Sequence, residues 1–325
     1  MSLKTENTVR VVIAVMAAAL ILAACGGGEQ ADDDGVLRIY TSVTQDTVDA
    51  VVAGFEEANP DAAVEVFRAP TGELSARIAA ELRDGSLVAD IFWLTDPLSI
   101  QQYERDGLLR EWDPENIEAV PQEFRTGSFF GTRVLNMVII ADGSLMETPS
   151  DWRDLTGIEG DVAIPDPGFA GSAFAALGFF ALSPDYGIDF YRDLKDNGGV
   201  QVRSPGDVVN GVAEGLYVAG VTLDRAARDA VEAGSPISLV WPASGAISLY
   251  SPIAVVDANG TETAEAFIEY VLSKEAQSAI ADTGWEPIRE DVDWPHTGAK
   301  LTIDWSLAFD RQDELLADYR EIFEG

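Results

Sequence analysis

Segments with the periodicity of β-strands alternate with segments of helical periodicity along most of this chain. The expected order of the first series is strand 37–40, helix 45–58, strand 63–67, helix 73–84 and strand 89–94. Asn59-Pro60-Asp61 supplies a break between two of these segments. Such alternation predicts an α/β fold in which helices flank mostly parallel sheets.

A second series of the same kind follows a predominantly apolar run at 134–141. Its expected elements are strands 162–164, 217–221 and 237–241, helices 171–181, 184–196, 205–214 and 224–233, a returning apolar segment 246–256, one or two helices within 263–281, and a helix 309–323. One hydrophobic core rarely serves about 300 residues. We therefore expect two lobes, 36–134 with 249–298 and 135–248 with 299–325, joined by two hinge strands near 135–140 and 249–255.

The N-terminus has the pattern of an export signal. Lys4 and Arg10 precede an apolar run at 11–24, which ends in small residues directly before Cys25. The run is too short to span a bilayer. By resemblance to bacterial lipoprotein signals, residues 1–24 are a signal peptide, Cys25 is acylated, and 25–35 form a flexible tether. A plain secretory peptide is the alternative. We expect the protein at the cell surface or in the periplasm, attached to the membrane by lipid.

The charge of the chain restricts its partners. It has 56 acidic and 21 basic residues, a formal net charge of -35. Phosphate backbones would repel such a protein, so we expect no nucleic-acid partner. The scarcity of lysine beside so many acids suggests a salt-rich habitat, in which self-repulsion is screened. Cys25 is the only cysteine, so no intramolecular disulfide can form.

Polar and small residues follow several of the expected strands. In open parallel sheets ligands bind beyond the carboxyl ends of strands, where helix N-termini converge and favour anions. The candidate ligand-binding residues are Ser42, Thr44, Thr71, Gly72, Asp96, Gly171, Ser172, Thr222, Asp224 and Trp241. Asp96 and Asp224 could pair with a ligand amine, and Trp241 could stack on a ligand. The alternatives are ordinary helix capping for the hydroxyls and acids, and core packing for the tryptophan.

Residues for catalysis are scarce. The single histidine, His296, lies in a loop far from the strand ends, and the usual metalloprotease, hydrolase and phosphate-loop motifs do not occur. We expect no catalytic residue, no bound metal and no cofactor.

Six segments together carry a family resemblance. They are Leu37-Arg38-Ile39-Tyr40-Thr41-Ser42, Thr71-Gly72-Glu73-Leu74, Ala89-Asp90-Ile91-Phe92-Trp93, the loop 166–173, Trp241-Pro242-Ala243-Ser244-Gly245, and Ala264-Glu265-Ala266-Phe267-Ile268 through Gln277. In this order the chain resembles extracellular solute-binding lipoproteins of ABC importers, in the type II two-lobed class of ferric-iron-binding proteins and their aminoethylphosphonate-binding relatives. The resemblance implies lobes that close on a small solute and present it to an ABC permease. We expect a monomer.

The resemblance is incomplete where iron would bind. Ferric-binding members often have a histidine after the first strand, a carboxylate after the third and a tyrosine pair in the second lobe. Here these positions fall near Thr44, at Asp96 and within 221–224, so only the carboxylate is matched. The hydroxyls and glycines instead favour a small anionic solute of phosphonate or phosphorylated organic type. Ferric iron remains the alternative ligand, and an anchored extracellular enzyme a weaker alternative.

Overall fold

The computed structural model describes residues 35–295 and 298–325. The expected signal peptide, Cys25, nearly all of the tether and His296 lie outside the described residues. Within the described part, no helix is both long and apolar enough to cross a membrane.

The described strands pair into one sheet in the order β2-β1-β3-β9-β4-β7-β5-β6, with β8 and β10 added to β4 and β11 added to β9. The strands are β1 (Val36–Thr41), β2 (Ala63–Arg68), β3 (Ile91–Trp93), β4 (Phe130–Asp142), β5 (Val162–Pro165), β6 (Gly199–Val202), β7 (Ala219–Leu223), β8 (Ile237–Val240), β9 (Ala246–Val255), β10 (Glu286–Pro287) and β11 (Lys300–Leu301). β1 and β3 are parallel, as are β5, β6 and β7, whereas β9 and β4 join these two groups by antiparallel pairing.

Helices connect most of these strands. They are α2 (Gln45–Ala58), α3 (Thr71–Asp84), α4 (Pro97–Arg105), α5 (Gly171–Leu182), α6 (Asp189–Asp196), α7 (Pro205–Ala213), α8 (Asp224–Glu232), α9 (Glu262–Val271), α10 (Lys274–Asp282), α11 (Trp305–Asp310) and α12 (Gln312–Glu324). Three short 3₁₀ helices lie at Ile117–Ala119, Gln122–Phe124 and Trp152–Thr156.

Local sequence explains where several helices begin and end. In α2, Val48, Val51 and Phe55 recur at helical spacing and are all buried, so one face of the helix packs on the sheet. α3 ends at Gly85, whose φ of 64° is readily adopted only by glycine. α4 starts with a proline directly after Asp96, which is a favoured arrangement for a first helical turn.

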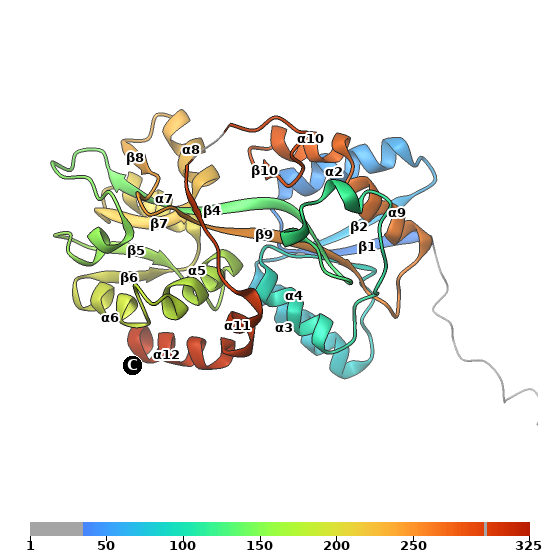
Figure 1. Ribbon diagram of the computed structural model, residues 1–325, viewed down its shortest axis with the longest axis horizontal. Helices are drawn as coiled ribbons and strands as arrows, with labels where there is room; N and C mark the ends of the chain where they lie inside the picture. The colour runs from blue at the N-terminus through green and yellow to red at the C-terminus, as the bar shows by residue number, and fades with distance from the viewer. Residues whose placement is uncertain (1–34, 296–297) are drawn as a thin grey trace, which may run out of the picture. The chain divides into compact units, whose positions relative to one another are not determined.

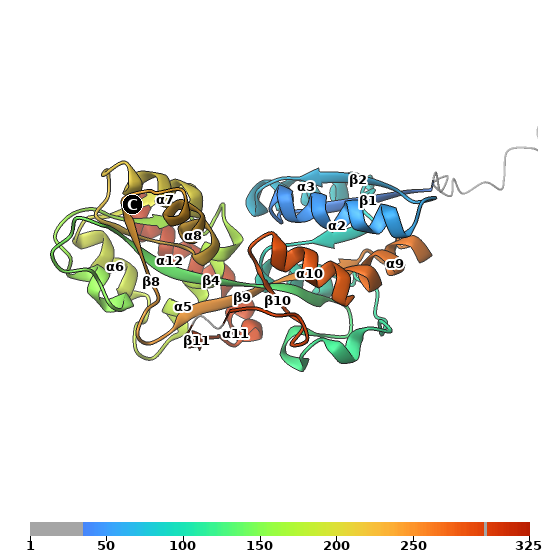
Figure 2. The same ribbon diagram turned by 90° about the horizontal axis from the view of Figure 1, so that it is seen from above.

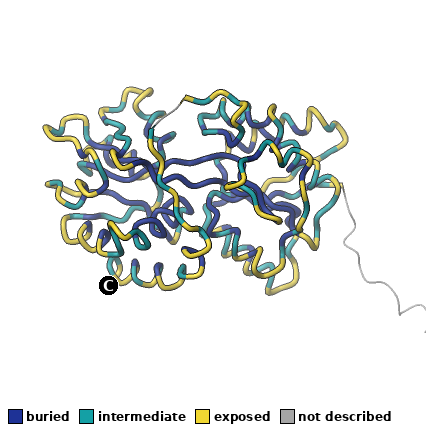
Figure 3. The backbone as a smooth tube through the Cα atoms, viewed as in Figure 1, coloured by how far each residue is buried: buried dark blue, intermediate teal, exposed yellow. Residues whose placement is uncertain are grey.

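β4 and β9 are the long strands that link the two groups of elements. They pair from Phe130 opposite Ile253 to Met137 opposite Ile247. Both views show them side by side, between the group that contains α2, α3, α9 and α10 and the group that contains α5 to α8 (Figures 1 and 2). All ten residues of β9 are buried, and both strands are drawn as buried along most of their length (Figure 3). Burial on both faces explains why apolar residues predominate in both strands and do not simply alternate with polar ones.

The predicted elements differ from the observed ones in a few places. β4 begins at Phe130 rather than 134, and α6 begins at Asp189 because the chain forms a turn at 184–186. The stretch 263–281 divides into α9 and α10, where Ser273 caps the second helix. The C-terminal stretch also divides: α12 packs on α5 and α6, while α11 lies against both α4 and α5. We did not predict α4 or β6.

Candidate functional site

A pocket of about 180 Å³ lies beyond the ends of strands from both groups. One wall comes from segments after β1, β2 and β3, and the other from the start of α5, the start of α7 and the end of β7. Its lining consists of Ser42, Thr44, Arg68, Pro70, Thr71, Thr95, Arg133, Leu135, Phe169, Ala170, Gly171, Ser172, Ser204, Pro205, Leu223 and Trp285. Hydroxyls, two guanidinium groups and two aromatic rings therefore face one small space.

Arg133 of β4 is the central charge of this pocket. Its side chain is only 1% exposed. Its Nε donates to Ser251 Oγ at 3.0 Å, and its Nη1 donates to Thr44 Oγ1 at 3.2 Å and Thr47 Oγ1 at 3.3 Å. Within the described residues Nη2 has no hydrogen-bond partner and the guanidinium forms no ion pair. Arg133 is thus a buried cation whose described hydrogen-bond partners are all neutral hydroxyls.

This environment destabilises the charged form of Arg133. Burial, reinforced by the nearby charge of Arg225, lowers the pKa of Arg133 to about 9, and Asp46 opposes the shift. A buried charge without a counter-ion is energetically costly. An anion bound in the pocket would supply that counter-ion.

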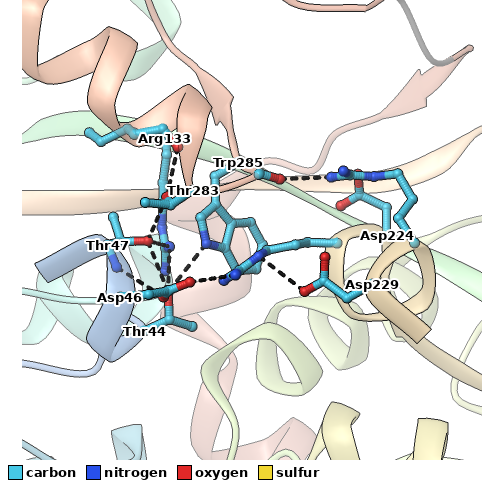
Figure 4. Close-up of polar contacts among 12 residues, drawn as sticks. Thr44, Asp46, Thr47, Arg133, Asp224, Asp229, Thr283 and Trp285 are labelled. Carbon is cyan, nitrogen blue, oxygen red and sulfur yellow. Dashed lines mark hydrogen bonds and ion pairs between the residues drawn. The ribbon is translucent and has the colours of Figure 1, made fainter. Parts of the chain in front are cut away.

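Trp285, directly before β10, provides an aromatic surface beside this cation. The Arg133 guanidinium lies 4.2 Å from the centre of the Trp285 ring, and the Trp285 indole donates to Thr44 Oγ1 at 3.2 Å. Thr44, Thr47 and Arg133 gather on one side of the ring and Asp224 and Asp229 on the other (Figure 4). Cation–π contact of this kind fixes the orientation of the guanidinium.

Arg68 adds a second positive charge at the end of β2. Its Nε donates to the carbonyl of Val43 at 2.7 Å, and it forms no ion pair with any residue in the described ranges. Unlike Arg133, Arg68 is exposed, so it can reorient toward a ligand. The described lining contains no carboxylate, phenol or imidazole. In a chain of net charge -35, this pocket is locally positive.

Two hydroxyls in the lining are free to bind a ligand. Thr71 and Ser172 make no side-chain hydrogen bond to any described residue. By contrast, Ser42 and Thr95 bond to each other at 3.0 Å, and Ser204 caps α7 by accepting from Asp207 N. Thr71 and Ser172 stand at the starts of α3 and α5, where backbone N–H groups favour anions.

The walls of the pocket touch at closely packed glycines. A Cβ on Gly171 would lie 2.0 Å from Asp96 Oδ2 and 2.9 Å from Thr71 Oγ1. A Cβ on Gly72 would lie 2.4 Å from the carbonyl oxygen of Gly168, and Gly72 N donates to the carbonyl of Phe169 at 3.3 Å. These positions require glycine because backbone from one group of elements meets the other group there.

Two ion pairs also connect the groups of elements around the pocket. Arg203, in the loop before α7, bonds to Glu73 of α3 at 2.5 Å, and Arg225 of α8 bonds to Asp46 of α2. The Arg203 pair is exposed and contributes little on its own. Together with the glycine contacts, the pairs hold the two walls in their observed positions.

The structure brings together half of the ten predicted ligand-binding residues. Ser42, Thr44, Thr71, Gly171 and Ser172 line the pocket. Gly72 and Thr222 support it from behind: Gly72 contacts the 168–169 backbone, and Thr222 Oγ1 donates to the carbonyl of Pro205 at 2.8 Å.

Asp96, Asp224 and Trp241 are not in the lining. The indole of Trp241 donates to the carbonyl of Ala299 at 2.8 Å and packs beside Gly298, so the structure gives it a packing contact in place of the predicted stacking.

The two candidate carboxylates are engaged within the protein. Asp96 is fully buried and caps α4, accepting from Leu98 N, Ser99 N and Ser99 Oγ at 2.8–3.1 Å. Burial raises the pKa of Asp96, and the bonds from Ser99 oppose that shift. Asp224 is 3% exposed and accepts from Arg228 Nη2 at 3.3 Å. Burial likewise raises the pKa of Asp224, against the charge of Arg228. Capping, the alternative that the sequence left open, is the observed role of Asp96.

Sequence reasoning missed Arg68 and Trp285, and periodicity could not orient Arg133, which was one of three further residues that could face the cleft. Arg68 ends β2 and could have been found by the strand-end rule that selected Thr71. Arg133 gave a different signal: it is a lone cation inside the apolar strand Phe130–Asp142. Trp285 follows α10, and no local pattern connects it to a site more than 200 positions earlier in the chain.

A larger hollow, of about 760 Å³, lies on the other side of β4. Val134 contributes to it, whereas its neighbours Arg133 and Leu135 line the smaller pocket, because side chains alternate between the faces of a strand. Glu123, Glu286, Glu290 and Asp293 border the larger hollow, along with Arg289 and Lys300. The smaller pocket is the better candidate site because it holds the uncompensated buried charge.

The fold thus consists of two groups of α/β elements joined by the long strands β4 and β9, with the small pocket beyond the strand ends of both groups. Residues 37–286 match the family model for bacterial extracellular solute-binding proteins. The chain belongs to this family, whose members are the solute-binding components of ABC transporters.

Similar proteins bind different solutes. A sulfate-binding protein of Synechocystis is 25% identical over 272 residues, covering 77% of this chain and 72% of that protein. A putative 2-aminoethylphosphonate-binding periplasmic protein of Salmonella typhimurium is 27% identical over 219 residues, covering 63% of this chain and 64% of that protein. These relatives differ in the solute that their names give, so similarity alone leaves the ligand of this chain open.

Solved structures confirm the predicted type II periplasmic-binding fold. The periplasmic binding protein AfuA of Actinobacillus pleuropneumoniae, with fructose-6-phosphate bound, has a TM-score of 0.77 at 20% identity and covers 90% of this chain and 99% of its own. Iron-bound HitA of Pseudomonas aeruginosa has the same TM-score at 18% identity, covering 88% of this chain and 99% of its own. At these identities the likeness establishes the fold.

Proposed function

We propose that this protein captures a small oxyanion in the pocket around Arg133 and presents it to an ABC permease. The observation that carries the proposal is Arg133 itself, a buried guanidinium whose partners are hydroxyls. The free hydroxyls of Thr71 and Ser172 supply further donors to oxyanion oxygens. The names of the sulfate- and aminoethylphosphonate-binding relatives fit such a ligand.

Ferric iron suits this pocket poorly. Iron(III) requires hard anionic oxygen ligands such as carboxylates and phenolates, and positive side chains repel it. The described lining offers hydroxyls and two arginines instead. Across residues 35–295 and 298–325, no group of three or more histidine, cysteine or acidic residues could hold a metal ion.

We infer that this chain also shares the transport role of its family. The bound solute leaves chemically unchanged, since lobe closure and release need only binding energy. The protein acts as a monomer, and lipid on Cys25 holds it at the membrane outside the cytoplasm. Cys25→Ser should therefore release the protein from the membrane fraction of expressing cells; membrane retention of this variant would contradict the lipid anchor.

Isothermal titration of the purified mature chain with sulfate, phosphate, methylphosphonate, fructose 6-phosphate and ferric citrate tests the ligand class. We expect an oxyanion to bind and Arg133→Gln to weaken its binding by about 100-fold or more, because a charge-assisted bond in a buried site is lost. Lys300→Gln, which removes a charge at the larger hollow, is the matched control and should change affinity less than about twofold. Tight ferric binding that survives Arg133→Gln would overturn the proposal.

A further inference from the structure

The charges around the pocket are unevenly compensated, and this inference rests on the function proposed above. Arg203 and Arg225, near the pocket, are each paired with an acid, Glu73 and Asp46 respectively. Arg133 and Arg68 line the pocket and form no ion pair with any residue that the structure describes. Closing the lobes around a monoanion would leave one of these two charges without a counter-ion. A dianion would neutralise both.

A ligand ammonium group would find no partner in this pocket. The described lining lacks carboxylates, and the nearby Asp96 already accepts three hydrogen bonds as the cap of α4. Asp224, the other acid expected to receive an amine, is buried against Arg228. An ammonium would therefore share a small space with two guanidinium groups, and like charges at this range repel each other.

The uncharged part of the lining sets the character of the remaining ligand. Leu135, Phe169 and Trp285 contribute apolar surface, and the pocket measures only about 180 Å³. A tetrahedral oxyanion fits alone or with a short uncharged substituent. We propose that the site selects a compact dianionic oxyanion that carries no amine, such as sulfate, a phosphate monoester or an alkylphosphonate.

Two phosphonates of nearly equal size provide the test. In n-propylphosphonate a methyl group replaces the ammonium of 2-aminoethylphosphonate. At a mildly alkaline pH, where both phosphonate groups carry two negative charges and the amine stays protonated, the pair differs mainly in one positive charge. Titration calorimetry of the wild-type mature protein should show n-propylphosphonate binding at least about tenfold more tightly. Equal affinity, or a preference for the amine, would overturn the selectivity while leaving oxyanion binding intact. Binding of neither phosphonate, nor of sulfate or phosphate, would instead refute the proposed function.

A charge introduced into the lining sharpens the same comparison. Thr95→Asp places a carboxylate in the pocket, and Thr95→Asn is the matched neutral control. The aspartate variant should cut the preference for n-propylphosphonate by about tenfold or reverse it, whereas the asparagine variant should keep the wild-type ratio. An unchanged ratio in a folded Thr95→Asp protein, checked by circular dichroism, would count against the inference.

The requirement for two negative charges has its own readout. Sulfate stays dianionic from about pH 5 to about pH 7, whereas methyl phosphate gains its second negative charge at about pH 6. Methyl phosphate binding should therefore tighten several-fold over this range while sulfate binding stays nearly constant. Parallel pH profiles for the two ligands would show that one charge suffices and would overturn the dianion requirement.

Discussion

Two hollows lie on opposite faces of β4, and they differ both in size and in charge. The larger, of about 760 Å³, is bordered by both acids and bases, and Lys300 there is paired with Glu286. The smaller, of about 180 Å³, holds a buried arginine that neutral hydroxyls surround. In a chain with 56 acidic residues, the locally positive pocket is the exceptional one. Uncompensated charge therefore identifies the candidate site better than volume does.

The largest expected effect is on ligand affinity and comes from one methyl group at Gly171. A Cβ there would lie 2.0 Å from Asp96 Oδ2, so Gly171→Ala should hold the two walls of the small pocket apart. We expect sulfate affinity, measured by calorimetry, to fall at least about 100-fold. Gly127→Ala is the control, because nothing lies within 4 Å of a Cβ at that glycine. Wild-type affinity in Gly171→Ala would mean that the ligand binds elsewhere, with the larger hollow as the next candidate.

Added salt should act with opposite signs on the pocket and on the rest of the molecule. The net charge of -35 makes the folded chain repel itself, and at about 1 M salt the screening length falls to about 3 Å. The melting temperature of the ligand-free protein should therefore rise by several degrees between about 0.1 M and about 1 M NaCl. Over the same range sulfate affinity should fall about three- to tenfold, because its attraction to Arg133 and Arg68 is screened. A melting temperature that is flat with salt would contradict self-repulsion.

Removing the buried charge should stabilise the empty protein. Arg133→Met replaces a desolvated cation with an apolar side chain of similar length, and such replacements are often stabilising by about 1 kcal/mol or more. For a chain of this size that gain corresponds to about 2–4 °C in melting temperature. Lys300→Met at the larger hollow should lower the melting temperature slightly or leave it unchanged, since it breaks a surface pair. A lower melting temperature for Arg133→Met would show that the hydroxyl contacts outweigh desolvation.

The smallest effect concerns Asp96, an acid buried behind the small pocket. Because its pKa is raised in the folded protein, the folded state holds a proton over a pH range in which the unfolded chain has released it. Asp96 therefore costs stability above its folded pKa, and this cost disappears as the pH falls toward about 4. Asp96→Asn keeps an oxygen to accept from Leu98 N and Ser99 N, so it should stabilise the protein by about 1 kcal/mol at neutral pH.

Denaturant unfolding of Asp96→Asn at neutral and acidic pH measures this difference. The gain should shrink as the pH is lowered; a gain that grows toward acidic pH would mean that the folded protein prefers the ionised form of Asp96.

The family and most of the fold could be predicted because their signals are local. Helical spacing of Val48, Val51 and Phe55 marks α2 without reference to any other segment. Short elements without a clear local pattern were missed. β6 is an example, because it has four residues and three of them are only partly buried. The strand-end rule likewise found Ser42, Thr44 and Thr71, since each follows or closely follows a strand in the chain.

By itself, the sequence determined the order of strands and helices, the membership in a family and the negative charge of the chain. Only the tertiary structure decided that Thr44, Arg133 and Trp285 meet. Arg133 lies 89 positions and Trp285 lies 241 positions after Thr44 in the chain, and no short-range periodicity connects them. It also decided which charges remain free for a ligand. Asp96 and Asp224 looked available in the sequence, yet burial and internal hydrogen bonds commit them to the fold. Charge compensation depends on distance in space, which a linear pattern does not contain.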